Sequence, residues 1–260
     1  MDEVLSLDGG RSFGILTRAA ADARGRAVVL FNAGLIHRVG PFRLHVHLAR
    51  RLAAQGFDVF RFDLPRIGDA PAGSHATQES AAREALDSVQ AATGATSFIV
   101  GGLCSAADLS WKVAVAEPRV DGLLLIDSMA VRSRWFRVGQ LQLLLRRPIS
   151  SWPRMAWRFF KPAKPVDGPG LADFRDWPDH AIFKSDLEKM LERGVKVLAL
   201  YTGGVAHYLL HRRQLDATFG ASRRHPGLQV HYWPGVDHLV FVPPDRQRMV
   251  ERISEWSAGG

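Results

Sequence analysis

The segment Phe98-Ile99-Val100-Gly101-Gly102-Leu103-Cys104-Ser105-Ala106-Ala107 decides the fold of this chain. It begins with an apolar run typical of a buried strand and continues into residues that favour a helix. Cys104 lies between the two and is the only cysteine in the sequence. Gly102 and Ala106, two positions before and after it, are small, as a crowded strand-to-helix turn requires. The segment therefore predicts that Cys104 occupies a sharp turn at the N-terminus of a helix, where the helix dipole favours a thiolate.

Short apolar runs alternate with longer amphipathic stretches along the rest of the chain. This alternation predicts an α/β fold with a mostly parallel central sheet flanked by helices. A hairpin at the start, with Asp8-Gly9-Gly10 as its turn, adds an antiparallel edge. Strands are expected at residues 2–7, 12–17, 27–31, 58–62, 97–101, 122–126, 195–201 and 228–233. Helices are expected at residues 41–55, 78–92, 106–117, 186–193, 206–219 and 246–256.

One stretch interrupts this alternation. Residues 128–184 separate two expected strands and are too long for a simple crossover connection. We therefore expect an α/β core formed by residues 1–127 and 185–260, with residues 128–184 inserted as a helical cap over the carboxyl ends of the strands. The 260 residues of the chain are enough for one such domain.

Composition limits the class of protein. The chain is 47% hydrophobic and 23% charged, as in an ordinary globular protein. A single cysteine excludes an internal disulfide and a zinc or iron–sulfur site with several cysteines. The sequence starts Met1-Asp2-Glu3, without the pattern of a signal peptide, and has no apolar run of about 18 residues, so we expect a cytoplasmic protein. The net charge of +8 could attract anionic partners, or reflect only an arginine-rich composition.

Four loop motifs follow predicted strands in a fixed order. Gly102-Leu103-Cys104-Ser105-Ala106 fits the nucleophile elbow G-x-S-x-G, with Cys in place of Ser and Ala in place of the last Gly. The other three are Asn32-Ala33-Gly34-Leu35 with His37-Arg38-Val39-Gly40, the segment 62–69, and Gly235-Val236-Asp237-His238. With these motifs the chain resembles the α/β-hydrolase fold family over nearly its whole length. More narrowly, it resembles the cysteine-containing hydrolases associated with exosortase systems.

The resemblance implies a role for each of these positions. Cys104 is the expected nucleophile and His238 its general base, whereas a buried, inert core cysteine is the alternative for Cys104. The backbone N–H groups of Leu35 and Ser105 are expected to form the oxyanion hole. Contacts to the substrate are expected from Gly34, Ile36, Trp135 and Trp157. His45, His47, His207 and His211 are interpreted as structural or exposed histidines in two of the expected helices.

The third member of a catalytic triad is harder to place. The resemblance puts an acid after the strand that ends near Tyr201, but residues 201–206 contain no carboxylate. Some members of the family carry the acid after the preceding strand, where this chain has Asp127. We therefore expect Asp127 to orient His238, or Cys104 and His238 to act without an acid. Asp237 is adjacent to His238, and because adjacent side chains diverge, we expect it to anchor the loop instead.

A cysteine nucleophile favours esters and thioesters, because a thiolate attacks activated acyl groups readily. The sequence therefore predicts an ester or thioester hydrolase that forms an acyl-enzyme, without a metal or redox cofactor. An acyltransferase with the same site and a non-catalytic binding protein on a degenerate scaffold are the alternatives.

The expected cap carries much of the positive charge. It has no acidic residue between Ala130 and Pro165, and tryptophan and phenylalanine residues alternate with the basic ones. Its basic face could bind a phosphate-bearing carrier, an acidic acyl-carrier protein or an anionic membrane surface, or could simply be solvated. Nucleic acid is not expected, because no recognition motif accompanies the charge. The nine basic residues are Arg132, Arg134, Arg137, Arg146, Arg147, Arg154, Arg158, Lys161 and Lys164.

Overall fold

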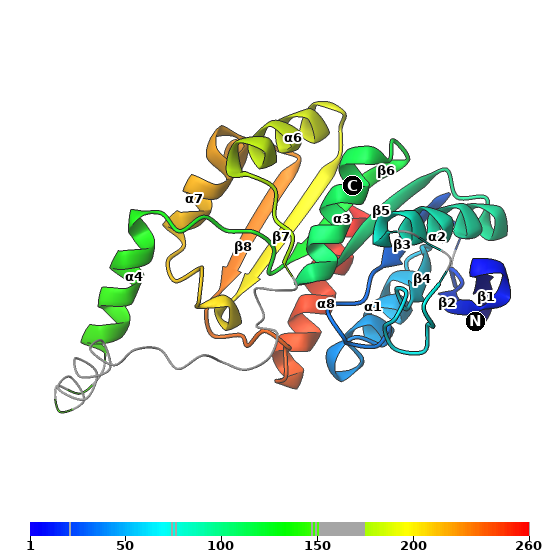
Figure 1. Cartoon of the computed structure of the whole chain (residues 1–260), viewed down its shortest axis with the longest axis horizontal. Helices are drawn as coiled ribbons and strands as arrows, with labels where there is room; N and C mark the ends of the chain where they lie inside the picture. Colours follow the sequence, from blue (N-terminus) through cyan, green and yellow to red (C-terminus); the bar gives the residue numbers. More distant parts are fainter. Residues whose placement is uncertain are drawn as a thin grey trace.

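A computed structural model of the chain describes residues 1–20, 22–73, 75, 77–146, 148, 150 and 175–259. Its centre is a sheet of eight strands in the order β1-β2-β4-β3-β5-β6-β7-β8 (Figure 1). β2 pairs antiparallel with both β1 and β4, and every other neighbouring pair is parallel. The strands are β1 Asp2–Leu7, β2 Ser12–Thr17, β3 Arg26–Leu30, β4 Asp58–Phe62, β5 Ser97–Leu103, β6 Val120–Ile126, β7 Lys196–Thr202 and β8 Leu228–Trp233.

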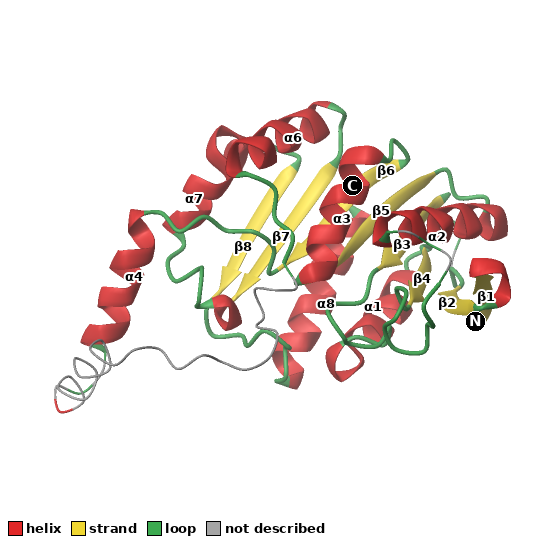
Figure 2. Cartoon of the chain, in the orientation of Figure 1, coloured by secondary structure: helices red, strands yellow, loops and turns green. Residues whose placement is uncertain are grey.

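Helices cover both faces of this sheet (Figure 2). The chain passes from β3 through α1 to β4, which lies on one side of β3 in the sheet. It then passes from β4 through α2 to β5, which lies on the other side of β3. Because both crossovers are right-handed, α1 and α2 lie on opposite faces of the sheet. α1 packs against α8, whereas α2 packs against α3. The helices are α1 Leu44–Ala53, α2 Gln78–Thr93, α3 Ser105–Ala116, α4 Arg134–Leu145, α6 His180–Glu192, α7 Arg213–Phe219 and α8 Pro243–Ala258.

The central strands are almost continuously buried, because helices lie on both of their faces. Every residue of β4 is buried, and in β6 only Asp121 is partly exposed. This confirms the expected fold class of a mostly parallel sheet flanked by helices. It also places the carboxyl ends of β3, β5, β6, β7 and β8 along one edge of the sheet, where the loops with the predicted site residues begin.

Two of the expected helices differ from the structure. The helix expected at 186–193 is longer, because Asp179 caps it and its N-terminal part buries Phe183. The helix expected at 206–219 is wrong over 206–212, and only α7 is formed. The side-chain oxygen of Gln214 accepts hydrogen bonds from the N–H groups of Leu210 and His211, so these groups take no helical partner.

The expected cap is only partly described. Its first helix, α4, packs against α7 at the β8 edge of the molecule (Figure 1). Residues 151–174 lie outside the described part of the chain, and α6 begins at His180, inside the range expected for the cap. The division into core and cap therefore stays a prediction. In the described part of the chain, no helix is both long and apolar enough to cross a membrane.

Candidate active site

Cys104 occupies the turn between β5 and α3 in a backbone conformation that side chains seldom adopt. Its φ is 60° and its ψ is −121°, and its N–H donates to the carbonyl of Ile126 at 2.8 Å. Such a conformation costs about 1–3 kcal/mol and persists only where the surrounding structure enforces it. The turn is closed tightly, since a Cβ on Gly102 would lie 2.9 Å from the carbonyl oxygen of Phe31 and collide with Ala106. The half-buried thiol therefore stands at the carboxyl edge of the sheet.

His238 and Asp127 meet beside this thiol. Nδ1 of His238 lies 2.7 Å from Oδ2 of Asp127, which is completely buried at the end of β6. This bond uses one ring nitrogen and leaves the other free to interact with the thiol of Cys104, and the two groups shift each other's pKa. The structure thus brings together three residues that are 23 and 111 positions apart along the chain, in the arrangement of a nucleophile, a base and an orienting acid.

Thr202 explains how the chain works without an acid at the end of β7. Its N–H donates to Oδ1 of Asp127 at 2.6 Å, and its hydroxyl donates to Oδ2 at 2.7 Å. The carboxylate of Asp127 therefore accepts bonds from Thr202 and from His238 at once, which fixes its orientation. Thr202 lies at the end of β7, where the resemblance expects an acid. It orients Asp127, which follows the neighbouring strand β6.

The electrostatics of the pair favour a thiolate facing an imidazolium. Burial by itself raises the pKa of Cys104, but the hydrogen bond to His238 and the charge of Arg175 outweigh it and lower that pKa. Burial lowers the pKa of His238, but hydrogen bonds to Asp127 and to Cys104 raise it to about 9. A lowered pKa of the thiol is the physical basis of a reactive cysteine.

Arg175 is a residue of this site that the sequence analysis missed. Its Nη1 lies 3.3 Å from Sγ of Cys104 and 2.9 Å from the carbonyl oxygen of Asp127. Its Nε and Nη2 form a two-pronged ion pair with the carboxylate of Asp108, at 2.7 and 2.9 Å, and the side chain is only 8% exposed. Trp177 donates its indole N–H to the same carboxylate at 3.1 Å. A full positive charge is thereby held against the nucleophile.

A weak signal in the sequence points to Asp108 alone. It lies four residues after Cys104 on the following helix, so both face the same side of that helix. Its partner Arg175 is 67 residues away, in the stretch expected to form the cap. Nothing in the local sequence distinguishes Arg175 from the other arginines of that stretch.

Two cavities meet at Arg175. One of about 390 Å³ is lined by Gly34, Leu35, Ser105 and residues of the 64–67 loop. The other, of about 520 Å³, has mainly apolar walls that include Met129, Ala130, Val131, Trp177 and Tyr208. Arg175 lines both of them and lies 3.3 Å from the sulfur of Cys104, so the two cavities adjoin beside the thiol.

Solved structures share this architecture. A Xanthomonas campestris protein described as an α/β serine hydrolase without lid is 13% identical, with a TM-score of 0.58 over 98% of this chain and 93% of that one. A thermophilic esterase from Thermogutta terrifontis is 16% identical, with a TM-score of 0.56 over 99% and 98% of the two chains. An α/β serine hydrolase homologue from Coxiella burnetii is 11% identical, with a TM-score of 0.57 over 98% and 96%.

This chain has the α/β-hydrolase fold. The likeness extends over nearly the whole length of each structure, and it concerns the fold, because the identities are low. No protein-family model and no curated protein sequence matches the chain. Within this fold, Cys104 directly follows β5 and His238 lies in the loop after β8.

The loop after β3 lies beside the turn that carries Cys104. The N–H of Gly34 donates to the hydroxyl of Ser105 at 2.8 Å, which ties this loop to the start of α3. Leu35 is 76% exposed, and both it and Ser105 line the cavity of about 390 Å³. Ile36 does not line that cavity. Its N–H closes a turn on the carbonyl of Ala33, and its side chain packs against the core.

The expected substrate contact of Trp135 is not supported. Trp135 lies on α4 and stacks on His211, with ring centroids 4.9 Å apart, while the guanidinium of Arg213 lies 4.5 Å from the centre of its ring. It lines neither cavity beside Cys104. Trp157 lies outside the described residues. Of the four expected substrate contacts, the structure places Gly34 alone on a cavity that reaches the nucleophile.

One cluster offers the ligand types that a metal prefers. In the described residues, only His37, Asp63 and Asp69 bring three such groups together. The guanidinium of Arg38 already bonds to both of these carboxylates, at 2.5 and 2.8 Å. A cation there would meet a fixed positive charge, so the cluster fits an ion-pair network better than a metal site.

Proposed function

We propose that this protein is a cysteine-dependent hydrolase that cleaves a carboxylic ester or thioester through an acyl-enzyme. One observation carries the proposal. Cys104 stands on a strained turn, its pKa is lowered by interaction with His238, and His238 is in turn held by the buried carboxylate of Asp127 at 2.7 Å. A core cysteine with only a packing role needs none of these three features.

Acylation starts from the thiolate of Cys104. The sulfur attacks the carbonyl carbon of the substrate and forms an S–C bond, while the carbonyl π electrons move to the oxygen. The N–H groups of Leu35 and Ser105 are proposed to stabilise this oxyanion. When the C–O or C–S bond to the leaving group breaks, the imidazolium of His238 protonates the departing alkoxide or thiolate.

Deacylation uses the same groups in reverse order. Neutral His238 takes a proton from water, and the hydroxide attacks the acyl-thioester of Cys104. Collapse of the second tetrahedral intermediate releases a carboxylic acid and returns the thiolate–imidazolium pair. Asp127 stabilises the imidazolium in each half-reaction and keeps its Nδ1 protonated.

The apolar cavity is the proposed binding site for the acyl chain. Its walls from Met129, Val131, Trp177 and Tyr208 suit a hydrocarbon chain, and it borders Arg175, which touches the sulfur. Arg175 also belongs to residues 128–184, so the end of the proposed cap reaches the reacting atom. The cysteine in the elbow supports the narrower resemblance to the exosortase-associated hydrolases.

The two alternatives differ in what supports them. The lack of an acid after β7 favours a non-catalytic binding protein on a degenerate scaffold. Asp127, held by Thr202 and bonded to His238, supplies an acid beside the end of β7 instead. Acyl transfer uses the same acyl-enzyme and replaces water by another nucleophile in the second step. The group that releases the acyl chain from the acyl-enzyme, water or another nucleophile, therefore distinguishes a hydrolase from an acyltransferase.

Intact-mass spectrometry with acyl thioesters and p-nitrophenyl esters of increasing chain length tests the proposal. We expect one acyl adduct per chain, which should be absent in Cys104→Ala because the acyl group is on the sulfur. The adduct should be lost with water, or faster with an added alcohol or thiol if the protein is a transferase. The matched control is Ser110→Ala, a buried substitution six residues along the same helix. Turnover that persists unchanged in Cys104→Ala would refute the proposal.

A further inference from the structure

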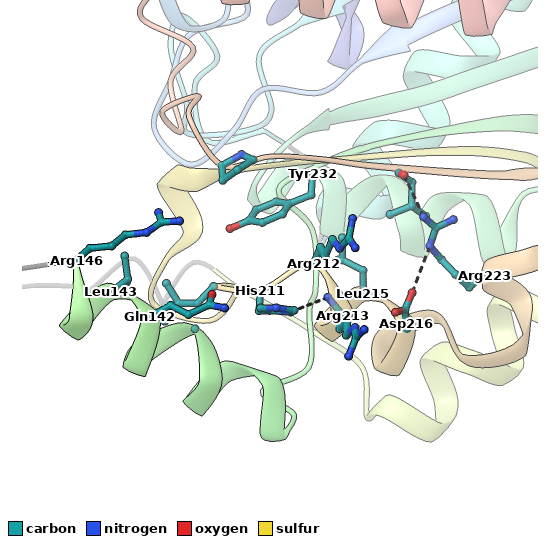
Figure 3. A pocket seen from close by; sticks show the side chains of 14 residues that line it. Gln142, Leu143, Arg146, His211, Arg212, Arg213, Leu215, Asp216, Arg223 and Tyr232 are labelled. Carbon is teal, nitrogen blue, oxygen red and sulfur yellow. Dashed lines mark hydrogen bonds and ion pairs between the residues drawn. The ribbon is translucent and has the colours of Figure 1, made fainter.

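A third cavity, of about 640 Å³, lies on the β8 side of the molecule, apart from the two at Cys104. It is enclosed by the C-terminal half of α4, the segment 210–216 and the end of β8 (Figure 3). None of its lining residues lines the cavities at Arg175. The nucleophile and its partners do not use it, so its chemistry needs a separate explanation.

Positive charge dominates the wall of this cavity. Among the described residues, four arginines line it, Arg146, Arg212, Arg213 and Arg223, against a single carboxylate, that of Asp216. Arg146 directly follows α4, Arg212 and Arg213 lie at the start of α7, and Arg223 lies in the 3-10 helix Gly220–Arg224 before β8. The tertiary structure therefore gathers them from three parts of the chain (Figure 3). Four cations around one acid leave a net charge of +3 on a concave wall, which attracts a multiply charged anion.

These guanidinium groups are not neutralised within the described part of the protein. No ion pair there involves Arg146, Arg212 or Arg213. Arg223 reaches Asp216 only at 4.0 Å, and its buried Nε has no hydrogen-bond partner among the described atoms. A buried donor without an acceptor is costly, and an anion in the cavity would satisfy it.

The segment that carries two of these arginines is held rigidly. The completely buried side chain of Gln214 accepts from the N–H groups of Leu210 and His211 and donates to the carbonyls of Val131 and Tyr208. The N–H of Arg213 donates to the ring of His211 at 3.1 Å. The backbone that carries Arg212 and Arg213 is therefore fixed in advance, which reduces the entropy lost on binding.

We propose that this cavity binds a phosphate-bearing small molecule. Guanidinium groups bind phosphate with paired hydrogen bonds, and a phosphate or diphosphate carries the two or more negative charges that four arginines would balance. The remaining wall, with Leu143, Leu215 and the Tyr232 ring, offers an apolar surface to the organic part of the ligand. The inference does not depend on the reaction at Cys104.

Calorimetric titration of the Cys104→Ala protein tests this proposal without any turnover. The probes are inorganic pyrophosphate, adenosine diphosphate and adenosine. We expect saturable, salt-sensitive binding of the two phosphate compounds and none of adenosine. Tighter binding of adenosine diphosphate than of pyrophosphate identifies a phosphorylated organic ligand, and the opposite order identifies inorganic polyphosphate as the ligand.

Three variants separate a site from general surface charge. Arg212→Ala, an exposed position that leaves the fold intact, should weaken binding about tenfold, because a phosphate loses a charge-assisted bond. Asp216→Asn should tighten binding about two- to fivefold, because it removes the one opposing charge. Arg137→Ala is the matched control, since Arg137 is an exposed arginine of α4 that does not line the cavity. Equal losses in Arg137→Ala and Arg212→Ala, or no saturation by either phosphate compound, would overturn the proposal.

Discussion

Replacement of Asp127 by asparagine tests the proposed site most directly. Asparagine keeps the shape of the side chain, but its amide nitrogen cannot accept a hydrogen bond from Nδ1 of His238 or from the hydroxyl of Thr202. The amide oxygen can still accept from the N–H of Thr202, so the loop keeps one of its anchors. The substitution removes the charge that stabilises the imidazolium and favours the wrong tautomer of the ring.

The size of the effect follows from the pKa of His238. Its rise from 6.5 to about 9 is equivalent to about 3 kcal/mol of stabilisation of the imidazolium. Cys104 provides part of this stabilisation, so Asp127 accounts for about half of it or more. Its loss should lower the population of the thiolate–imidazolium pair at pH 7 by about ten- to a hundredfold.

The rate of alkylation by iodoacetamide, followed by intact mass, reports that population. We expect Asp127→Asn to alkylate about ten- to a hundredfold more slowly than the native protein at pH 7. Asp237→Asn is the control. Asp237 precedes His238 and accepts from the N–H groups of Leu239 and Phe241, so the alkylation rate should hardly change. If folded Asp127→Asn reacts at the native rate, the role given to Asp127 is wrong.

Three further predictions concern the same site. Arg175→Gln removes the charge beside the sulfur, so the pKa of Cys104 should rise and alkylation at pH 6 should slow several-fold. An unchanged pH profile of alkylation would show that Arg175 only packs there. Gly102→Ala should destabilise the protein by about 1–3 kcal/mol in urea unfolding, because the added carbon collides with Ala106, and an unchanged midpoint would contradict the packing seen here. As pH rises through about 9, His238 loses its proton and can no longer protonate the leaving group. Turnover of substrates with poor leaving groups should therefore fall, while alkylation of Cys104 stays fast. A parallel decline of both rates would count against the acid role of His238.

The linkage of His238 to stability has a definite sign. Its pKa in the folded protein is raised, so its contribution to the free energy of unfolding is fully present below about pH 6.5 and is lost as pH rises through about 9. The lowered pKa of Cys104 acts in the opposite direction, since its contribution is present above the ordinary pKa of a thiol and is lost at lower pH.

The sequence was enough to predict the fold and the strand-to-helix turn at Cys104. Strand and helix periodicity and the small residues around Cys104 are local properties, so the order of elements and the turn at Cys104 were predictable from the chain. The main error occurred where a side chain replaces a backbone carbonyl as the hydrogen-bond partner. The helix expected at 206–219 fails over 206–212 because Gln214 captures the backbone N–H groups there.

Only the tertiary structure decided which groups surround the sulfur. Asp127 could be suspected at the end of its strand, but its bonds to Thr202 and His238 join three separate strand ends. The pairing of Arg175 with Asp108 spans 67 residues and has no pattern in the sequence. Charge and hydrogen bonding act through space, so the chain order that specifies the strands does not specify which side chains meet at their ends.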